Sequence, residues 1–326
     1  MNRKNPFKKY YDLSNNETSV SKFKNLPSFP RYIDIELTNS CNFKCLMCPT
    51  GNLSQTRKTG FMSDDVFDKV LVDIKPHLTP LRFIRWGEPT LHPNFVDYIQ
   101  KSHNLGILTH MNTNGSKLDD LYMENIINAG LNSIKFSFQG VDRKSYDEMR
   151  RIDFYDDLID TIKRFVDIRG DREYPFVQVS TSVTYENKDI IKRFRETLEG
   201  IVDKVTIGRT VLGRINLETV RLKQPDRDLL EKLRNEESVV KKHLKCPEVF
   251  DKLSINWDGT ISACCTDYDN LMTIGDISND SLENIWNSKK MNQYRSSLSR
   301  MEHYKNKLCS TCYDYASIQS DNIQKI

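Results

Sequence analysis

The feature that most constrains the fold of this 326-residue chain is a regular alternation of strand-like and helix-like segments. Short apolar runs predict six strands, at 32–37, 81–86, 107–113, 132–138, 176–183 and 202–208. Apolar residues at helical spacing predict helices between them, at 63–74, 94–106, 119–130, 145–166 (interrupted near Asp153) and 188–199. This order predicts an α/β fold with a parallel sheet and outer helices, and an active site at the C-terminal ends of the strands.

Six such units are fewer than the eight that close a full TIM barrel, so we expect a partial (β/α)6 TIM-like barrel over residues 32–225. A charged segment then predicts a linker helix within 226–245. From residue 246 to 326 the pattern changes: short strands flank a predicted hairpin turn at Asp258–Gly259, and helices follow at about 281–301 and near the C-terminus. We therefore expect a second, smaller α+β domain over 246–326.

The charge balance and the first 31 residues limit the partners and the cellular location that we expect for this protein. A net charge of +3, with 45 acidic residues, is too small and too mixed to indicate nucleic acid or a membrane surface. No stretch approaches the roughly 18 apolar residues of a membrane span. Residues 1–31 lack the apolar run of a signal peptide, and we expect a surface-draped arm or a docking segment. A cytoplasmic location follows, where thiols stay reduced and clustered cysteines indicate metal.

The eight cysteines fall into two groups, and the first directly follows the first predicted strand. Cys41, Cys45 and Cys48 form a C-x3-C-x2-C pattern in "CNFKCLMC". Three thiolates at this spacing can hold three corners of a cubane iron–sulfur cluster and leave the fourth iron open. Zinc is the alternative, but it needs a fourth ligand, which His92 or His110 could supply from a neighbouring loop or strand.

This pattern resembles the signature of the radical S-adenosylmethionine (SAM) enzymes, and the resemblance extends through the alternating region. "WGEPTLHP" (86–93), "TNG" (113–115) and "SFQG" (137–140) follow the second, third and fourth strands in the family's order. The resemblance implies a [4Fe–4S] cluster on Cys41, Cys45 and Cys48 that binds SAM. It also implies that Glu88 accepts from the methionine amine of SAM. The residues that it assigns to SAM are Met47, Gly87, Glu88, Pro89, Asn114, Ser137 and Arg150, the last two near the methionine carboxylate.

Two residues depart from the family pattern. Met47 stands where an aromatic residue often lies near the adenine, and Trp86 stands where a second glycine usually precedes the GEP segment. Both changes affect the expected shape of the adenine pocket and of the substrate cavity. The remaining candidates read mainly as structural: the histidines as packing residues, and Arg85 and Arg209 as solvated charges that could otherwise meet an anionic substrate. Tyr268 and Asp269 could line a cavity between the domains, and no catalytic acid or base is assigned.

The second cysteine group resembles the auxiliary-cluster extension known as the SPASM/twitch region, through "INWDGTISACCTD" and "IGDISNDSLENIWNS". The chain lacks the further cysteines of the full form, so the resemblance implies the shorter twitch form with one fully ligated [4Fe–4S] cluster. A zinc ribbon is the alternative. The "DGT…C" pattern assigns Cys264 rather than Cys265 as ligand, and alternation on a strand turns Cys265 away into packing. The implied ligands are Cys246, Cys264, Cys309 and Cys312.

The function implied by the resemblance is an oxidation by a 5′-deoxyadenosyl radical. The cysteine layout is most similar to that of the 2-deoxy-scyllo-inosamine dehydrogenases, which predicts dehydrogenation of an alcohol on a sugar or aminocyclitol, with flavodoxin or ferredoxin as electron donor. Epimerisation or elimination on a sugar nucleotide is an alternative outcome of the same radical. A peptide-modifying maturase is a second alternative, although the 31-residue arm is short for a peptide-recognition domain. A zinc- or cluster-stabilised binding protein without enzymatic activity is a third.

Overall fold

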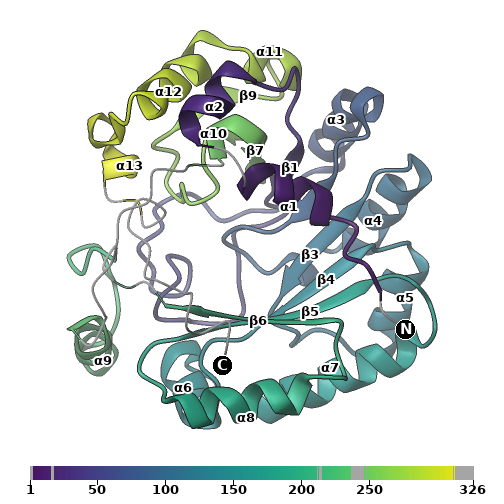
Figure 1. Ribbon diagram of the computed structural model, residues 1–326, viewed down its shortest axis with the longest axis vertical. Helices are drawn as coiled ribbons and strands as arrows, with labels where there is room; N and C mark the ends of the chain where they lie inside the picture. Colours follow the sequence, from purple (N-terminus) through teal and green to yellow (C-terminus); the bar gives the residue numbers. More distant parts are fainter. Residues whose placement is uncertain are drawn as a thin grey trace.

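A computed structural model describes residues 3–15, 18–210, 212, 215–235, 246, 248–310 and 312 of the chain (Figure 1). Within these residues the six predicted strands are present and pair in sequence order, each parallel to the next. The expected α/β fold with a parallel sheet is therefore confirmed. The strands are β1 (Tyr32–Ile35), β2 (Leu81–Phe83), β3 (Thr109–Thr113), β4 (Ser133–Ser137), β5 (Phe176–Val183) and β6 (Lys204–Arg209).

Helices follow the strands and cover the outside of the sheet, as Figure 1 shows. The helical stretch predicted at 145–166 is two helices, because Arg151 ends the first in a left-handed conformation, with φ of 58°. None of the described helices is both long and apolar enough to cross a membrane. The outer helices are α3 (Asp64–Ile74), α4 (Phe95–Asn104), α5 (Asp120–Asn128), α6 (Arg143–Arg150), α7 (Tyr155–Arg169) and α8 (Lys188–Leu198), with short 3-10 turns η1 (Lys75–His77) and η2 (Pro89–Leu91).

The two sides of the sheet differ in polarity, because successive strand residues point to opposite sides. Ile33 and Ile35 of β1 belong to the apolar core that the outer helices share. Asp34, between them, pairs instead with Arg82 of β2 at 2.5 Å and with Lys252 at 3.1 Å. The inner side of the partial barrel therefore carries buried charged pairs.

The C-terminal strands continue the sheet of the barrel. Strand β7 (Lys252–Ile255) pairs in parallel with β1, and β8 (Thr260–Ser262) and β9 (Thr273–Asp276) follow in antiparallel order. The strand order is therefore β6-β5-β4-β3-β2-β1-β7-β8-β9. The predicted antiparallel hairpin is present, and helix 281–301 is divided near Ser288. The remaining helices are α9 (Gln224–Asn235), α10 (Glu248–Asp251), α11 (Leu282–Trp286), α12 (Lys289–Ser299), η3 (His303–Lys305) and α13 (Lys307–Ser310).

The N-terminal arm forms two helices, and the first covers charged residues of the inner side of the sheet. Phe7, just before α1 (Lys8–Asn15), is fully buried with its ring 5.5 Å from that of His110 on β3. Tyr11 of α1 contacts the ring of Tyr32, and the guanidinium of Arg82 lies 5.6 Å from the Tyr11 ring centroid. The arm is therefore part of the packed structure at this point.

The second helix of the arm, α2 (Ser19–Lys24), packs against the C-terminal elements α10 and α12, as Figure 1 also shows. Lys22 is buried and forms an ion pair with buried Asp251, which also pairs with Arg31 at 3.1 Å. The indole of Trp286 donates to the carbonyl of Pro27 at 2.9 Å. Residues 18–31 are thus built into the C-terminal unit, where the sequence predicted a surface-draped arm or a docking segment.

Candidate active site between the two cysteine groups

The first cysteine group occupies a tight loop after β1. The Cys48 amide donates to the Cys45 carbonyl at 3.2 Å, and a Cβ on Gly51 would lie 2.4 Å from the same carbonyl oxygen. The loop can therefore fold back on itself only because residue 51 is glycine. None of the three cysteines is in a disulfide. Burial raises the pKa of Cys41 to about 12 and raises that of Cys48, so these thiols must lose protons as a metal binds.

The spacing of the three thiols distinguishes a cluster from a single ion. In the part of the chain that the structure describes, one group of metal-ligand atoms converges within 4.8 Å, and it is Asp34, Glu248 and Cys265. Cys41, Cys45 and Cys48 are therefore spread more widely than the ligands of one zinc ion, which bind at roughly 2.3 Å from the metal. Three free thiols on one loop at this wider spacing fit a multi-iron cluster.

The Glu88 carboxylate joins the GEP segment to the TNG segment. One oxygen accepts from the Thr90 amide at 3.2 Å and from the hydroxyls of Thr90 and Thr113 at 2.8 Å each. The other accepts from the Asn114 amide at 2.8 Å. Burial raises the pKa of Glu88, and the hydrogen bonds act against that rise. The sequence predicted that Glu88 contacts the amine of SAM, and this stays a prediction. The motif gave no sign that Glu88 also holds the two loops together.

Gly87 and Pro89 fix the path of the GEP segment beside the cysteine loop. A Cβ on Gly87 would lie only 2.0 Å from the Thr38 carbonyl oxygen, and the neighbouring Glu88 amide donates to the Ser40 carbonyl at 2.9 Å. Gly87 thus permits a close backbone approach to the residues that precede Cys41. Pro89 is buried at the start of η2, where its fixed φ suits the turn.

Three further residues assigned to SAM lie against the cysteines. The side-chain amide nitrogen of Asn114, Nδ2, is 3.9 Å from the Cys41 sulfur. The buried Arg150 guanidinium donates to the Cys45 sulfur at 3.4 Å and to the backbone carbonyl of Ser137. The structure therefore brings Asn114, Ser137 and Arg150 together around the first group, with the positive charge of Arg150 beside a thiol.

His92 and His110 are both used in structural hydrogen bonds. His92 bonds to the Met62 carbonyl at 2.8 Å through Nε2. His110 bonds to Ser133 at 3.0 Å and to Asn112 at 2.9 Å through its two nitrogens. Burial lowers the pKa of both rings. This arrangement agrees with the packing role predicted for both and leaves neither of these two imidazoles free for a zinc site with Cys41.

The second cysteine group is assembled from separate segments. Burial raises the pKa of Cys246, and the nearby charges of Glu248, Cys312 and Cys309 add to that rise. Cys246 in turn lies among the charges that raise the pKa of buried Cys264. Cys309 lies in α13, and its backbone carbonyl accepts a hydrogen bond from the Cys312 backbone amide at 3.2 Å. Three of the four cysteines assigned from the resemblance, Cys264, Cys309 and Cys312, therefore lie near the fourth, Cys246.

Neighbouring Cys264 and Cys265 lie in different surroundings. The Cys264 sulfur is 3.1 Å from the Thr266 hydroxyl. The Cys265 amide donates to Glu248 at 3.0 Å, and its sulfur is 3.6 Å from the Lys252 ammonium. The sequence predicted that Cys265 turns into the packing of the small domain; it lies instead in a buried charged network, because β7 places Lys252 beside Asp34 of the barrel. Cys264 as the ligand stays a prediction, and the two environments favour it.

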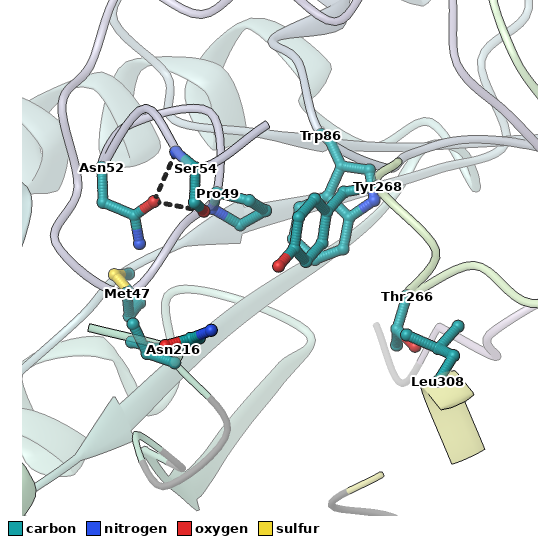
Figure 2. A pocket seen from close by; sticks show the side chains of 10 residues that line it. Met47, Pro49, Asn52, Ser54, Trp86, Asn216, Thr266, Tyr268 and Leu308 are labelled. Carbon is teal, nitrogen blue, oxygen red and sulfur yellow. Dashed lines mark hydrogen bonds between the residues drawn. The ribbon is translucent and has the colours of Figure 1, made fainter. Parts of the chain in front are cut away.

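A cavity of about 110 Å³ lies between the two groups, and Figure 2 shows the side chains that line it. Trp86 and Tyr268 form one wall, with ring centroids 5.8 Å apart and planes at 85°. Of the other candidates, Asp269 accepts from the Thr56 amide at 2.7 Å, and Arg209 is exposed. The lining residues are Met47, Pro49, Asn52, Ser54, Trp86, Ile215, Asn216, Thr266, Tyr268 and Leu308.

A partial parallel barrel with a three-cysteine loop at the C-terminal end of β1 fits an iron–sulfur protein. The sequence profile of the Radical SAM superfamily matches residues 35–198, and the chain belongs to this superfamily. The profile of the SPASM iron–sulfur cluster-binding domain matches residues 246–313. The first domain implies SAM and a [4Fe–4S] cluster, and the second implies an additional iron–sulfur cluster. Both cofactor predictions are thus confirmed at this level.

Known proteins share the fold and parts of the sequence. A tungsten-containing aldehyde ferredoxin oxidoreductase cofactor-modifying protein of Pyrococcus furiosus is 32% identical over 109 residues, which cover 33% of this chain and 30% of that protein. The chain spans less than half the length of this and two other curated relatives, at 30%, 23% and 46%.

Two solved structures show the same fold at low sequence identity. BtrN in complex with AdoMet and 2-DOIA has a TM-score of 0.57 and 15% identity, and the match covers 90% of this chain and 94% of BtrN. SuiB of Streptococcus suis, bound to precursor peptide SuiA, has a TM-score of 0.65 and 17% identity over 85% of this chain and 70% of SuiB. The partial barrel with its auxiliary domain is therefore a shared architecture.

Proposed function

We propose that this protein is a radical SAM oxidoreductase that dehydrogenates an alcohol of a small, sugar-like or aminocyclitol-like substrate. The observation that carries the proposal is the position of the cavity. Met47 and Pro49, which flank Cys48, line one side of it. Thr266 and Leu308, next to the second cysteine group, line another. A substrate held there would lie between the two cysteine groups.

The residues around the cavity would bind the substrate and exclude water. When bound, SAM and its cluster would supply a 5′-deoxyadenosyl radical that takes a hydrogen atom from the carbinol carbon; as the carbonyl forms, the remaining electron would pass to the auxiliary cluster and the hydroxyl proton to solvent. Asn52 accepts from the Ser54 amide and hydroxyl at 3.1 and 2.7 Å, so polar groups at one end of the cavity are already fixed (Figure 2). Trp86 and Tyr268 supply apolar surface opposite them. This combination of an apolar wall and a few fixed polar groups suits a small polyhydroxylated ring.

The proposed ligand sets follow the sequence assignments. Cys41, Cys45 and Cys48 would hold the SAM-binding cluster, with Glu88, Asn114 and Arg150 positioned beside it. The second group would hold one auxiliary [4Fe–4S] cluster. Support for a small substrate comes from the shared fold with BtrN, which was obtained with 2-DOIA. Flavodoxin or ferredoxin would deliver the electron that starts the reaction.

Anaerobic reconstitution followed by incubation with SAM, dithionite and candidate cyclitols, aminocyclitols and sugars tests the proposal. We expect cleavage of SAM to 5′-deoxyadenosine together with a ketone or aldehyde product. A substrate deuterated at the carbinol carbon should pass one deuterium to 5′-deoxyadenosine. Recovery of an epimer or an elimination product without oxidation would overturn the dehydrogenase assignment while leaving the radical chemistry in place.

A peptide-modifying maturase is the second candidate, favoured by the shared fold with SuiB, which binds the precursor peptide SuiA. The same incubation with candidate precursor peptides separates the two functions. We expect no mass change in the peptides. Modification of peptides alone would overturn the proposed dehydrogenase function and establish the peptide-modifying function in its place.

A further inference from the structure

The side chain of Arg85 is buried against the turn that follows Cys264, and it is incompletely paired. Arg85 follows β2; its side chain has no solvent exposure, and its backbone adopts a φ of 127°, which residues other than glycine rarely do. Its Nη2 donates to the Asp267 carbonyl at 2.7 Å. Among the described residues, its Nε and Nη1 atoms have no hydrogen-bond partner. Such a backbone conformation is rare and is found mainly at functional sites.

The carboxylate nearest to Arg85 is already paired with another arginine. Glu36 accepts from both terminal nitrogens of Arg57 at 2.8 Å each, whereas Arg85 Nε lies 3.8 Å from Glu36. The Asp267 carboxylate accepts from Ser262, Leu271 and Met272, so Arg85 meets only the backbone of that residue. A buried guanidinium with two unused donors is unfavourable unless an acceptor or an anion lies nearby.

Lys252 provides a contrast, because its charge is matched. Its ammonium lies 3.1 Å from Asp34 and 2.5 Å from Glu248, both buried. Lys252 therefore belongs to a closed set of ion pairs. Arg85 does not, because its Nε and Nη1 have no hydrogen-bond partner among the described residues and its Nε lies 3.8 Å from Glu36.

The backbone that Arg85 holds is the turn that follows Cys264. The Asp267 amide donates to the Cys264 carbonyl at 3.2 Å, and the Asp267 carbonyl accepts from Arg85. Asp267 thus links the guanidinium of Arg85 to the backbone of Cys264, the assigned auxiliary ligand. A cluster with four thiolate ligands is an anion, and it gains a further negative charge on reduction, so its reduction potential depends on nearby charge and hydrogen bonds.

We propose that Arg85 is a positioning residue of the auxiliary cluster, whose positive charge stabilises the reduced form of that cluster. This inference rests on the proposed function, in which that cluster accepts an electron from the substrate. An electron would be accepted more readily there because the burial of Arg85 leaves its charge unscreened by solvent.

An EPR redox titration of the loaded, full-length protein without substrate tests this proposal. SAM changes the signal of the cluster that binds it, so the SAM-insensitive signal reports the auxiliary cluster. We expect Arg85→Gln to shift the midpoint potential of that signal to more negative values, and Arg85→Lys to leave it close to the wild-type value. Arg209→Gln is the matched control, because it removes the same charge from an exposed site at the same end of the barrel, and we expect no shift.

A wild-type potential in Arg85→Gln, or an equal shift in Arg85→Lys and Arg85→Gln, would overturn the proposal. If Arg85→Gln does not retain the auxiliary iron, Arg85→Lys decides: a loaded cluster at the wild-type potential supports the role of charge, and loss of its iron refutes it. Because no substrate is present, the result is independent of the product assay. A shifted potential without ketone formation would refute the dehydrogenase function and leave the role of Arg85 intact.

Discussion

The two cysteine groups are built in opposite ways. Cys41, Cys45 and Cys48 lie on one loop, which backbone hydrogen bonds and two close glycine contacts hold in place. The second group takes cysteines from separate segments, and the N-terminal arm contributes as well: the Ser19 hydroxyl accepts from the Cys246 amide at 3.2 Å. The first site thus depends on local structure, and the second depends on the assembly of distant parts. Substitutions should therefore affect the two sites separately.

The largest expected effect comes from removing the first group. The triple variant Cys41→Ala, Cys45→Ala, Cys48→Ala should lose about half of the iron and all SAM cleavage, because each group is proposed to hold one cluster. The counterpart Cys309→Ala, Cys312→Ala should lose the other half and retain cleavage of SAM to 5′-deoxyadenosine. Iron analysis and chromatography of the nucleoside measure both. Cleavage that survives in the triple variant would show that the site is wrongly assigned.

The next largest effect separates the adjacent cysteines of the second group. Cys264→Ala should abolish the auxiliary cluster, because Cys264 is one of its four proposed ligands and lies near Cys246. Cys265→Ala should retain it, because the Cys265 sulfur contacts Lys252 instead. Iron content and visible absorption of the reconstituted proteins give the comparison. Loss of iron in Cys265→Ala alone would reverse the assignment.

A smaller effect tests the close contact at the first site. Gly87→Ala places a Cβ 2.0 Å from the Thr38 carbonyl oxygen, so we expect a loss of stability at or above about 3 kcal/mol, the upper end for overpacking. Gly208→Ala is the control, because its nearest neighbour would lie at 3.8 Å, an ordinary contact. Urea unfolding of both variants measures the difference. Equal stability of the two variants would contradict the close packing of the GEP segment.

The smallest effect tests the contribution of the arm to the second site. Lys22→Met breaks the buried pair with Asp251, and we expect a loss of about 2 kcal/mol, below the usual range for such pairs because Arg31 still neutralises Asp251. Auxiliary iron should fall while SAM cleavage is retained. Lys24→Met, exposed on the same helix, should change stability by less than about 0.5 kcal/mol. An equal loss in both variants would show that the arm supports the second site only weakly.

The difference in construction also explains what could be predicted from the sequence. Six strands, their helices and the first cysteine group follow from local periodicity and a compact motif. The pairing of β7 with β1 does not, because strands about 220 residues apart leave no shared local pattern. The surroundings of Cys265 and the arm follow from that pairing and were therefore missed.

Arg85 illustrates the same limit on a single side chain. A charged residue that flanks a strand is usually solvated, so the sequence predicts a solvated Arg85. The structure buries Arg85 because the loop from Cys264 to Asp269 covers the end of β2, and that loop is distant in sequence. Trp86, in contrast, lines the cavity whose shape it was expected to change.

The continuous sheet has a consequence for the rate of electron transfer. Strand β1 leads into the first cysteine loop, β7 lies beside it in register, and the β7–β8 hairpin leads to Cys264. Backbone hydrogen bonds across adjacent strands therefore set the separation of the two redox centres. Tunnelling rates fall steeply with distance, so a separation fixed by strand register would hold this rate constant from one turnover to the next.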